Sequence, residues 1–122
     1  MRVLLADNQP SVRLALRLLL EQEQDSVLAD EAGNCDELLE QTAAGCPDLV
    51  LLDWQLSGLR NKAVLLLALR SLRPGISIIA LDVHPQTRQV ALSAGADEFV
   101  CKRNPPEHLL EAINRCRAKK SS

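Results

Sequence analysis

The sequence predicts an α/β fold in which a five-stranded parallel sheet carries helices on both faces. Three observations predict it. Short apolar runs recur along the chain, segments with helical periodicity separate them, and three of the runs end on an aspartate, at Asp7, Asp53 and Asp82. Alternation of strands and helices is typical of parallel sheets with right-handed crossovers. Because aspartate is depleted inside strands, each of the three marks a point where a buried strand reaches the surface.

The first half of the chain is expected to form three strands and two helices. Proline suits the first turn of a helix, so Pro10 marks the start of the first one. Gly45 and Pro47 are expected to end the second helix. The third strand is apolar at every position, as in strands buried on both faces of a sheet. In order, the elements are strand 3–6, helix 10–23, strand 27–29, helix 35–44 and strand 49–52.

The second half continues the alternation after a loop from Gln55 to about Arg60. Its first helix is leucine-rich and apolar nearly all round, which indicates either deep packing or one side that meets a partner. Pro85 can open the next helix, and Gly95 can end it. The elements are helix 61–71, strand 76–81, helix 85–94, strand 99–101 and helix 107–119. All ten elements together predict a doubly wound, flavodoxin-like sheet with strand order 2-1-3-4-5.

Composition limits the classes of function. The length of 122 residues fits one domain, 1–122, and the net charge of -2 argues against a nucleic-acid-binding face. No apolar run reaches the roughly 20 residues that span a bilayer. The chain enters its first strand directly, so we expect no cleavable signal. Its four cysteines lack the spacing of a zinc site and are expected to be reduced. We therefore expect a cytoplasmic domain.

Four charged side chains are expected at one edge of the sheet. Asp7, Asp53, Asp82 and Lys102 follow strands one, three, four and five, and the carboxyl ends of parallel strands share an edge. Two carboxylates about 4 Å apart repel by on the order of 4 kcal/mol at a surface-like dielectric, so three of them need a cation, a proton or Lys102. Oxygen-rich clusters suit Mg²⁺. A metal beside an aspartate and a lysine is typical of phosphoryl-transfer sites.

Three segments carry a family likeness: RVLLADNQPSVR, PDLVLLDWQLSG, and AGADEFVCK followed by PPEHLLEAI. Together they resemble the receiver domain of response regulators in two-component signalling, over nearly the whole chain. The resemblance implies that Asp53 accepts a phosphoryl group from a histidine kinase and that Lys102 contacts that group. It places Phe99 at an aromatic switch position. It also implies Mg²⁺ as cofactor, held by Asp7, Asn8, Asp53 and the backbone carbonyl of Gln55.

Two positions depart from the family pattern. Asn8 stands where most receivers have a second acid, which leaves the metal site one charge short. Asp82 stands where the family has threonine or serine, whose hydroxyl bonds the phosphoryl group and moves with it. An ionised carboxylate cannot donate that bond and would repel the incoming dianion. The alternative is that Asp82 supplies the metal carboxylate that Asn8 lacks.

These departures leave two hypotheses for a signalling module without enzymatic activity. The first is a working receiver, which switches a protein-interaction face when Asp53 is phosphorylated. The second is a degenerate receiver, which binds proteins without phosphorylation. A flavin carrier is disfavoured, because the loop 7–10 has no glycine and the chain has no tyrosine.

The resemblance also implies partners. Besides the histidine kinase, we expect either a homodimer or an output domain, bound through the surface from the fourth strand to the last helix, which includes Arg103. No direct contact with nucleic acid or membrane is expected. The chain is either a stand-alone regulator or a fragment of a longer one.

Overall fold

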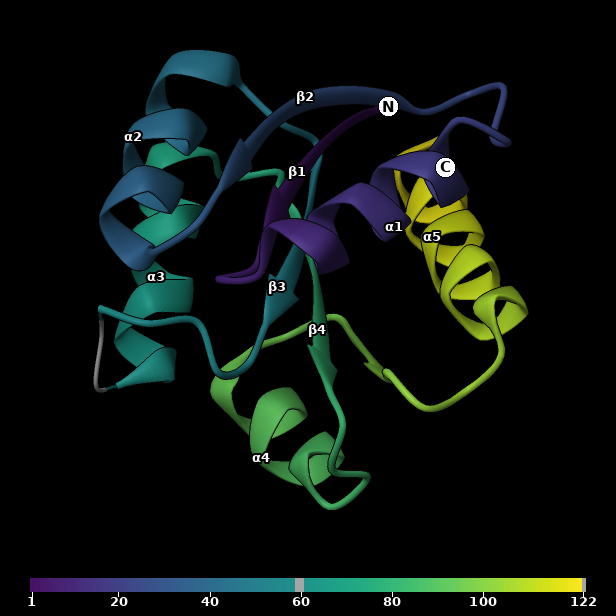
Figure 1. The fold of residues 1–122 in the computed structure, drawn as a ribbon. Coiled ribbons are helices and arrows are strands. Elements are labelled where there is room, and N and C mark those ends of the chain that lie inside the picture. The colour runs from purple at the N-terminus through teal and green to yellow at the C-terminus, as the bar shows by residue number, and fades with distance from the viewer. Residues whose placement is uncertain (59–60, 122) are drawn as a thin grey trace.

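Five parallel strands form one sheet in the order β2-β1-β3-β4-β5, which confirms the predicted topology. The structure is a computed structural model that describes residues 1–58 and 61–121. Helices connect successive strands, so the sheet lies between two helical layers (Figure 1). The strands are β1 (Arg2–Ala6), β2 (Val27–Ala32), β3 (Leu49–Asp53), β4 (Ser77–Asp82) and β5 (Glu98–Cys101). The helices are α1 (Pro10–Leu20), α2 (Cys35–Gly45), α3 (Lys62–Leu72), α4 (Thr87–Ala94) and α5 (Pro106–Ser121).

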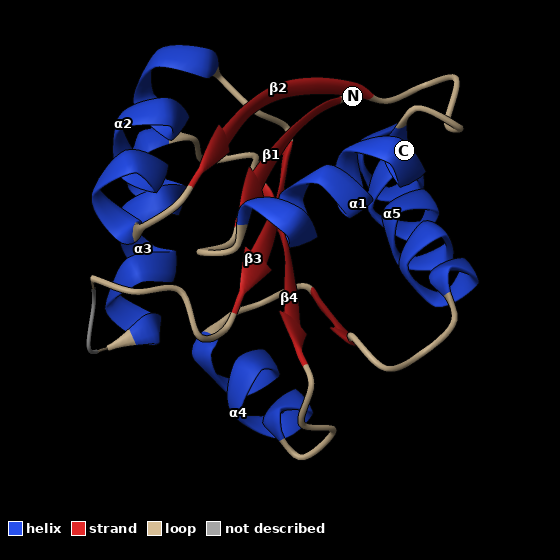
Figure 2. Ribbon diagram, in the orientation of Figure 1, coloured by secondary structure: helices blue, strands red, loops and turns tan. Residues whose placement is uncertain are grey.

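Alternate residues of each strand pack against opposite layers, because successive side chains of a strand point to opposite faces. Leu4, Val50 and Ile78 contribute to the core beneath α2, α3 and α4. Leu5 and Leu51 contribute to the core beneath α1 and α5. Figure 2 shows the sheet between these two helical layers. Burial of β3 and β4 on both sides explains why their sequences read as continuous apolar runs.

Two elements near the N-terminus differ in length from the prediction. Helix α1 ends at Leu20, short of Glu23, because the following amides turn back in i→i−3 hydrogen bonds to Leu19 and Leu20 carbonyls. Strand β2 continues past residue 29 to Ala32, which pairs with Ala6 of β1. An edge strand can carry polar residues toward solvent, and this polar part of β2 hid the strand from the sequence pattern.

Two helix boundaries also differ from the prediction. Gly45 is the last residue of α2 rather than its stop, and Cys46 takes the left-handed conformation with φ 47°. The Arg2 guanidinium donates to the Gly45 carbonyl and so satisfies a terminal acceptor of α2. Pro85 lies in a turn before α4, where its carbonyl accepts from the Arg88 amide. Gly95 does adopt positive φ at the end of α4, as predicted.

Helix α3 is not buried all round. Leu65, Leu66 and Leu69 face the core, whereas Leu67 is 68% exposed and Val64 is 53% exposed. The helix therefore combines deep packing on one side with an apolar outer side, and a partner for that outer side stays a prediction. The predicted loop before it ends at Arg60, which lies outside the described residues.

Two further observations bear on the expected class of protein. No helix in the described part of the chain is long and apolar enough to cross a membrane. All four cysteines are free thiols: Cys35, Cys101 and Cys116 are buried, and Cys46 is exposed.

Candidate functional site

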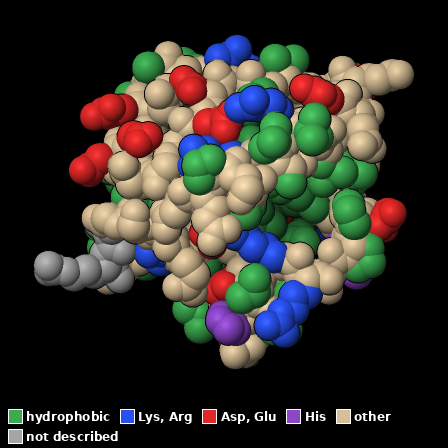
Figure 3. All heavy atoms as spheres, viewed as in Figure 1, with side chains coloured by type: hydrophobic (Ala, Val, Ile, Leu, Met, Phe, Trp, Pro, Cys, Tyr) green, Lys and Arg blue, Asp and Glu red, His purple; other side chains and the backbone are tan. Residues whose placement is uncertain are grey.

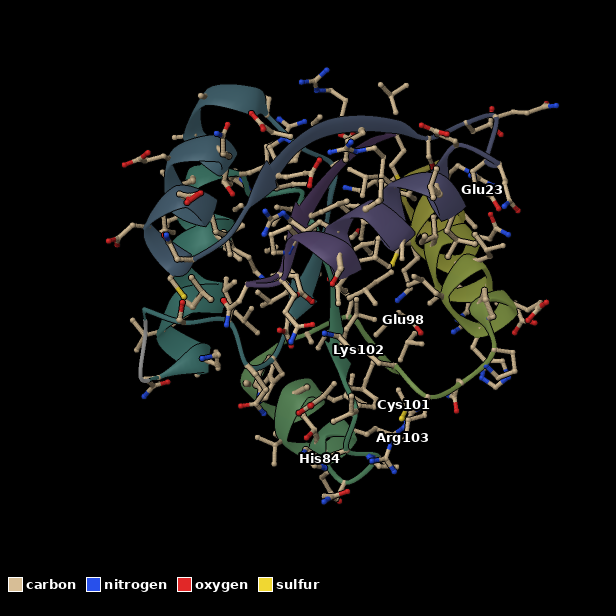
Figure 4. All side chains as sticks on the ribbon, in the orientation of Figure 1. Glu23, His84, Glu98, Cys101, Lys102 and Arg103 are labelled. Atoms are coloured by element: carbon tan, nitrogen blue, oxygen red, sulfur yellow. The ribbon has the colours of Figure 1, made fainter. Side chains whose placement is uncertain are left out.

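Lys102 joins two aspartates at the carboxyl edge of the sheet. Its ammonium lies 2.7 Å from Asp7 Oδ2 and 3.4 Å from Asp53 Oδ1. Asp7 follows β1, Asp53 ends β3, and Lys102 follows β5, so three strands bring these side chains together. Figure 4 shows Lys102 at this end of the strands. The predicted meeting of residues 7, 53 and 102 is therefore present.

The shared ammonium does not fully offset the two acids. Asp7 and Asp53 are both buried, with 1% and 7% of their surface exposed. Burial raises the pKa of Asp53 above its usual value, and the neighbouring charge of Asp7 adds to the rise. The Gln55 amide, which donates to Asp53 Oδ1 at 3.1 Å, and Lys102 act in the opposite direction. Two carboxylates with one ammonium favour a further cation at this edge.

Asn8 is held by the loop that follows β3. Its Oδ1 accepts hydrogen bonds from the Ser57 amide at 3.0 Å and from the Ser57 hydroxyl at 3.3 Å. Its Nδ2 donates to the Gln55 carbonyl at 3.4 Å. The two neutral oxygens that the resemblance assigns to the metal thus already accept protein hydrogen bonds. These hydrogen bonds compete with a cation for the same oxygens.

Asp82 does not join the other two acids. Its Oδ2 accepts from the Thr87 hydroxyl at 2.8 Å and from Gln55 Nε2 at 3.1 Å, and its Oδ1 accepts from the Val83 amide at 2.7 Å. Burial alone would raise the pKa of Asp82, but these bonds and one from the His84 amide lower it. Asp82 is therefore an ionised, fully buried carboxylate that is already hydrogen-bonded.

The expected cluster of three acids is accordingly not formed. Within residues 1–58 and 61–121, no group of three or more His, Cys, Asp or Glu side chains is arranged to hold a metal ion. The physical reason is that donors at the start of α4 and after β3 already bind the Asp82 carboxylate. The Asp82 backbone carbonyl accepts a hydrogen bond from the Lys102 amide at 2.7 Å.

The remaining donors nevertheless fit Mg²⁺ in their chemistry. Asp7 and Asp53 supply two buried carboxylates, and Gln55 and Asn8 supply neutral oxygens. Magnesium in proteins relies on one or two carboxylates and keeps several waters. The incomplete charge balance around Asp53 supports the same fit.

Phe99 lies at the buried side of β5, with 3% of its surface exposed. The Arg88 guanidinium of α4 covers its ring, 5.3 Å from the centroid, in a cation–π contact. Sequence reasoning did not identify Arg88, Thr87 or Ser57. The one available signal was Thr87, a hydroxyl residue five positions after a strand-ending aspartate.

An apolar groove of about 600 Å³ borders the site. It lies between α1 and the segment after β5, and its lining includes Leu18, Leu19 and Pro106 as well as Lys102. Figure 3 shows hydrophobic side chains gathered in a hollow on this face. His84 and Arg103 are exposed, and Figure 4 places both toward α4, beyond Lys102.

Comparison with known families matches residues 3–114 to the response regulator receiver domain. The chain belongs to this family. The match covers the sheet and the site, including positions 7, 53 and 102. As a receiver domain, it is a signal-transduction module of two-component systems, whose characteristic function is to accept a phosphoryl group. The hypothesis of a degenerate receiver is not favoured by this match.

Individual relatives agree with the assignment. The receiver is 31% identical over 117 residues to the nitrate/nitrite response regulator protein NarL of Escherichia coli, a match that covers 95% of this chain and 54% of that protein. It is 32% identical to the transcriptional activator protein ExaE of Pseudomonas putida, with 94% and 54% covered. The chain thus spans about half the length of the curated relatives it matches.

Solved structures give the same result. A LuxR-family response regulator from Aurantimonas has a TM-score of 0.87 and 27% identity, covering 97% of this chain and 85% of that one. The signal receiver domain of a putative response regulator NarL from Mycobacterium tuberculosis has a TM-score of 0.82 and 26% identity, covering 94% of each chain. The receiver fold is therefore shared along almost the entire chain.

Proposed function

We propose that Asp53 is the phosphoryl acceptor of this receiver and that a histidine kinase is its donor. The observation that carries the proposal is Lys102, whose ammonium contacts Asp53 at 3.4 Å and Asp7 at 2.7 Å at the open edge of the sheet. Lys102 is thereby positioned to contact anionic oxygens added to Asp53. Its side chain is 22% exposed, which leaves this edge open to a donor.

In the proposed reaction a carboxylate oxygen of Asp53 attacks phosphorus. The new O–P bond forms as the bond from phosphorus to the histidine nitrogen of the kinase breaks, and that nitrogen keeps the electron pair. The product is an acyl phosphate on Asp53. Lys102 offsets charge on the phosphoryl oxygens, and the Gln55 amide, 3.1 Å from Asp53 Oδ1, orients the carboxylate.

Mg²⁺ is the proposed cofactor, held by Asp7, Asn8, Asp53 and the carbonyl of Gln55. Its chemistry is to neutralise charge that develops on the transferred group. The hydrogen bonds from Ser57 to Asn8 Oδ1, and from Asn8 Nδ2 to the Gln55 carbonyl, compete with a cation for these two oxygens. We therefore propose that Mg²⁺ binds this receiver more weakly than it would bind a site with an acid at position 8.

The test is to incubate the domain with acetyl phosphate and MgCl₂ and to measure its intact mass. We expect a gain of one phosphoryl group in the wild type and no gain in Asp53→Asn, which removes the nucleophile and keeps the size of the side chain. An unchanged wild-type mass would overturn the proposal and favour the phosphorylation-independent alternative. A gain in both proteins would show that another residue is the acceptor.

The surface from β4 to α5 is the proposed site for a homodimer partner or an output domain. Val83 and Val90 are exposed on this surface, with 38% and 58% of their area accessible. Arg103 is also exposed, and Figure 4 shows it near His84, toward α4. We propose a module without enzymatic activity that acts by this contact, in the cytoplasm. That residues 1–122 form a single domain, alone or within a longer regulator, stays a prediction.

A further inference from the structure

We propose that Asp82 ties α4 to the loop after β3 in the unphosphorylated receiver, and that negative charge added to Asp53 releases this tie. The inference rests on the proposed function in one respect, the phosphorylation of Asp53. The inference also states how α4 responds to phosphorylation: its hold on the loop after β3 is loosened. In receivers with threonine or serine at this position, a hydroxyl is drawn toward the phosphoryl group, whereas here a carboxylate would be driven away from it.

The tie consists of two hydrogen bonds to one carboxylate oxygen. Asp82 Oδ2 accepts from Thr87, the first residue of α4, at 2.8 Å, and from the Gln55 side chain at 3.1 Å. Asp82 is 1% exposed, so water does not compete freely for these donors. Hydrogen bonds to charged groups are stronger than those between neutral groups. One buried anion thus links the loop after β3 to the start of α4.

Helix α4 depends on this link because it has few other anchors. It has only eight residues, of which Ala91 is buried and Ala94 is partly buried against the core. The residue before it, Gln86, provides no side-chain hydrogen bond to the first turn. Apart from the Arg88 contact with Phe99, the Thr87 hydroxyl is the side-chain anchor that we identify at the start of α4. Short, poorly buried helices open locally more easily than the core does.

Gln55 connects the tie to the acceptor. Its backbone amide donates to Asp53 Oδ1, and its side-chain amide donates to Asp82 Oδ2. Asp53 and Asp82 end adjacent strands, since Asp53 pairs with Leu81 in the register of β3 and β4. A phosphoryl group on Asp53 adds acceptors that compete for the Gln55 donors. Its charge also repels the ionised Asp82 carboxylate, so both effects weaken the hold on Thr87.

Hydrogen–deuterium exchange of the α4 peptide, residues 83–95, tests the tie in the unmodified protein. Thr87→Val removes the hydroxyl and keeps the shape, and we expect exchange in α4 to become about ten-fold faster. Thr87→Ser keeps the hydroxyl and serves as the matched control, with wild-type exchange expected. Equal exchange in the valine and serine variants would overturn the tie.

Beryllium fluoride with Mg²⁺, as an anionic mimic of the phosphoryl group on Asp53, tests the release. We expect faster α4 exchange in the wild type and little further change in Thr87→Val. Asp82→Asn keeps an acceptor without the charge, so its response should be smaller. Slower α4 exchange in the treated wild type would overturn the release, because it would mean that α4 is held more tightly.

Different measurements would overturn the phosphorylation of Asp53 and the tie between Asp82 and Thr87. Absence of a phosphoryl gain in the intact mass would overturn the function proposed for Asp53, and the release with it. The valine and serine comparison needs no phosphorylation, so the tie between Asp82 and Thr87 stands or falls on that result alone.

Discussion

Asn8 Oδ1 accepts a hydrogen bond from the backbone amide of Ser57 at 3.0 Å. The residue after Asp7 therefore holds the loop after β3 directly. An acid at position 8 could still accept from Ser57, but it could not donate to the Gln55 carbonyl as Asn8 Nδ2 does. The amide thus favours a closed loop, where a carboxylate would favour a bound metal.

Replacing this amide by an acid is expected to strengthen magnesium binding. Asn8→Asp adds a negative charge and removes the donor to Gln55. Most of the Coulomb gain, about 8 kcal/mol between one carboxylate charge and the two charges of Mg²⁺ at 4 Å and an effective dielectric of 20, is offset by desolvation. We expect affinity to rise on the order of ten-fold, which corresponds to about 1.4 kcal/mol. Fluorescence of Trp54, next to Asp53 and 9% exposed, would report the titration.

Asn8→Ala is the control for that titration, because it removes both the oxygen that accepts from Ser57 and the amide that donates to Gln55. It should bind Mg²⁺ no more tightly than the wild type. Identical affinities for the wild type, Asn8→Asp and Asn8→Ala would contradict the placement of position 8 at the metal site.

Removing the shared ammonium should destabilise the protein. Lys102→Met leaves Asp7 and Asp53 buried without their common cation. Loss of one partner from a buried ion pair costs about 3–5 kcal/mol, and the partial exposure of Lys102 places this case nearer 2 kcal/mol. Urea unfolding without metal would measure the loss. MgCl₂ should restore more stability to Lys102→Met than to the wild type, and equal effects would argue against a shared cation site.

The amino edge of the sheet offers a pH-dependent test away from the site. Burial alone would raise the pKa of Asp48, but hydrogen bonds from the Arg2 amide at 2.8 Å and from Arg73 at 3.3 Å lower it. With a folded pKa below the unfolded value of about 3.9, Asp48 stabilises the fold above that value. The contribution is lost as the pH falls through the folded pKa.

Asp48→Asn should therefore cost stability at pH 7, by at most about 1 kcal/mol because the pair is partly exposed. The difference from the wild type should shrink below about pH 4. Thermal unfolding across this range measures it, with Glu40→Gln, an exposed acid of α2, as the control. A difference that stays constant down to acidic pH would show that charge is not the cause.

Neighbouring leucines of α3 should respond differently to truncation. Leu66 is 1% exposed and Leu67 is 68% exposed. Leu66→Ala removes buried surface and leaves a cavity, so a loss of about 2–5 kcal/mol is expected. Leu67→Ala should cost less than about 0.5 kcal/mol. Urea unfolding of both variants checks the assignment of the buried side of α3, and similar losses would contradict it.

Much of the fold was predictable because its signals are local. The apolar runs of β3 and β4 and the spacing of their flanking helices identify a parallel sheet within short windows of sequence. Prediction did less well where residues are polar. The last part of β2 was missed because Asp30 and Glu31 do not alternate with apolar residues. Glu31 is instead stabilised in the strand by ion pairs with Arg13 and Arg17 from α1.

The site was predictable in position but only partly in geometry. Parallel topology alone places the residues that follow β1, β3, β4 and β5 at one edge, so the encounter of Asp7, Asp53 and Lys102 followed from the sequence. The hydrogen-bond partners of the Asp82 carboxylate could not be predicted from the sequence. Its carboxylate turns toward Gln55 and Thr87, and a strand pattern carries no information about which donors a loop will present.

By itself, the sequence determined the order of elements, the two-faced core and the edge where charged residues collect, because periodicity and strand ends are properties of adjacent residues. The tertiary structure alone decided how the charges at that edge are satisfied. Asn8 meets Ser57 across 49 positions of chain, and Gln55 meets Asp82 across 27. Such partners are chosen when loops from different strands pack together, since a buried polar group takes the donor that the folded backbone brings within reach.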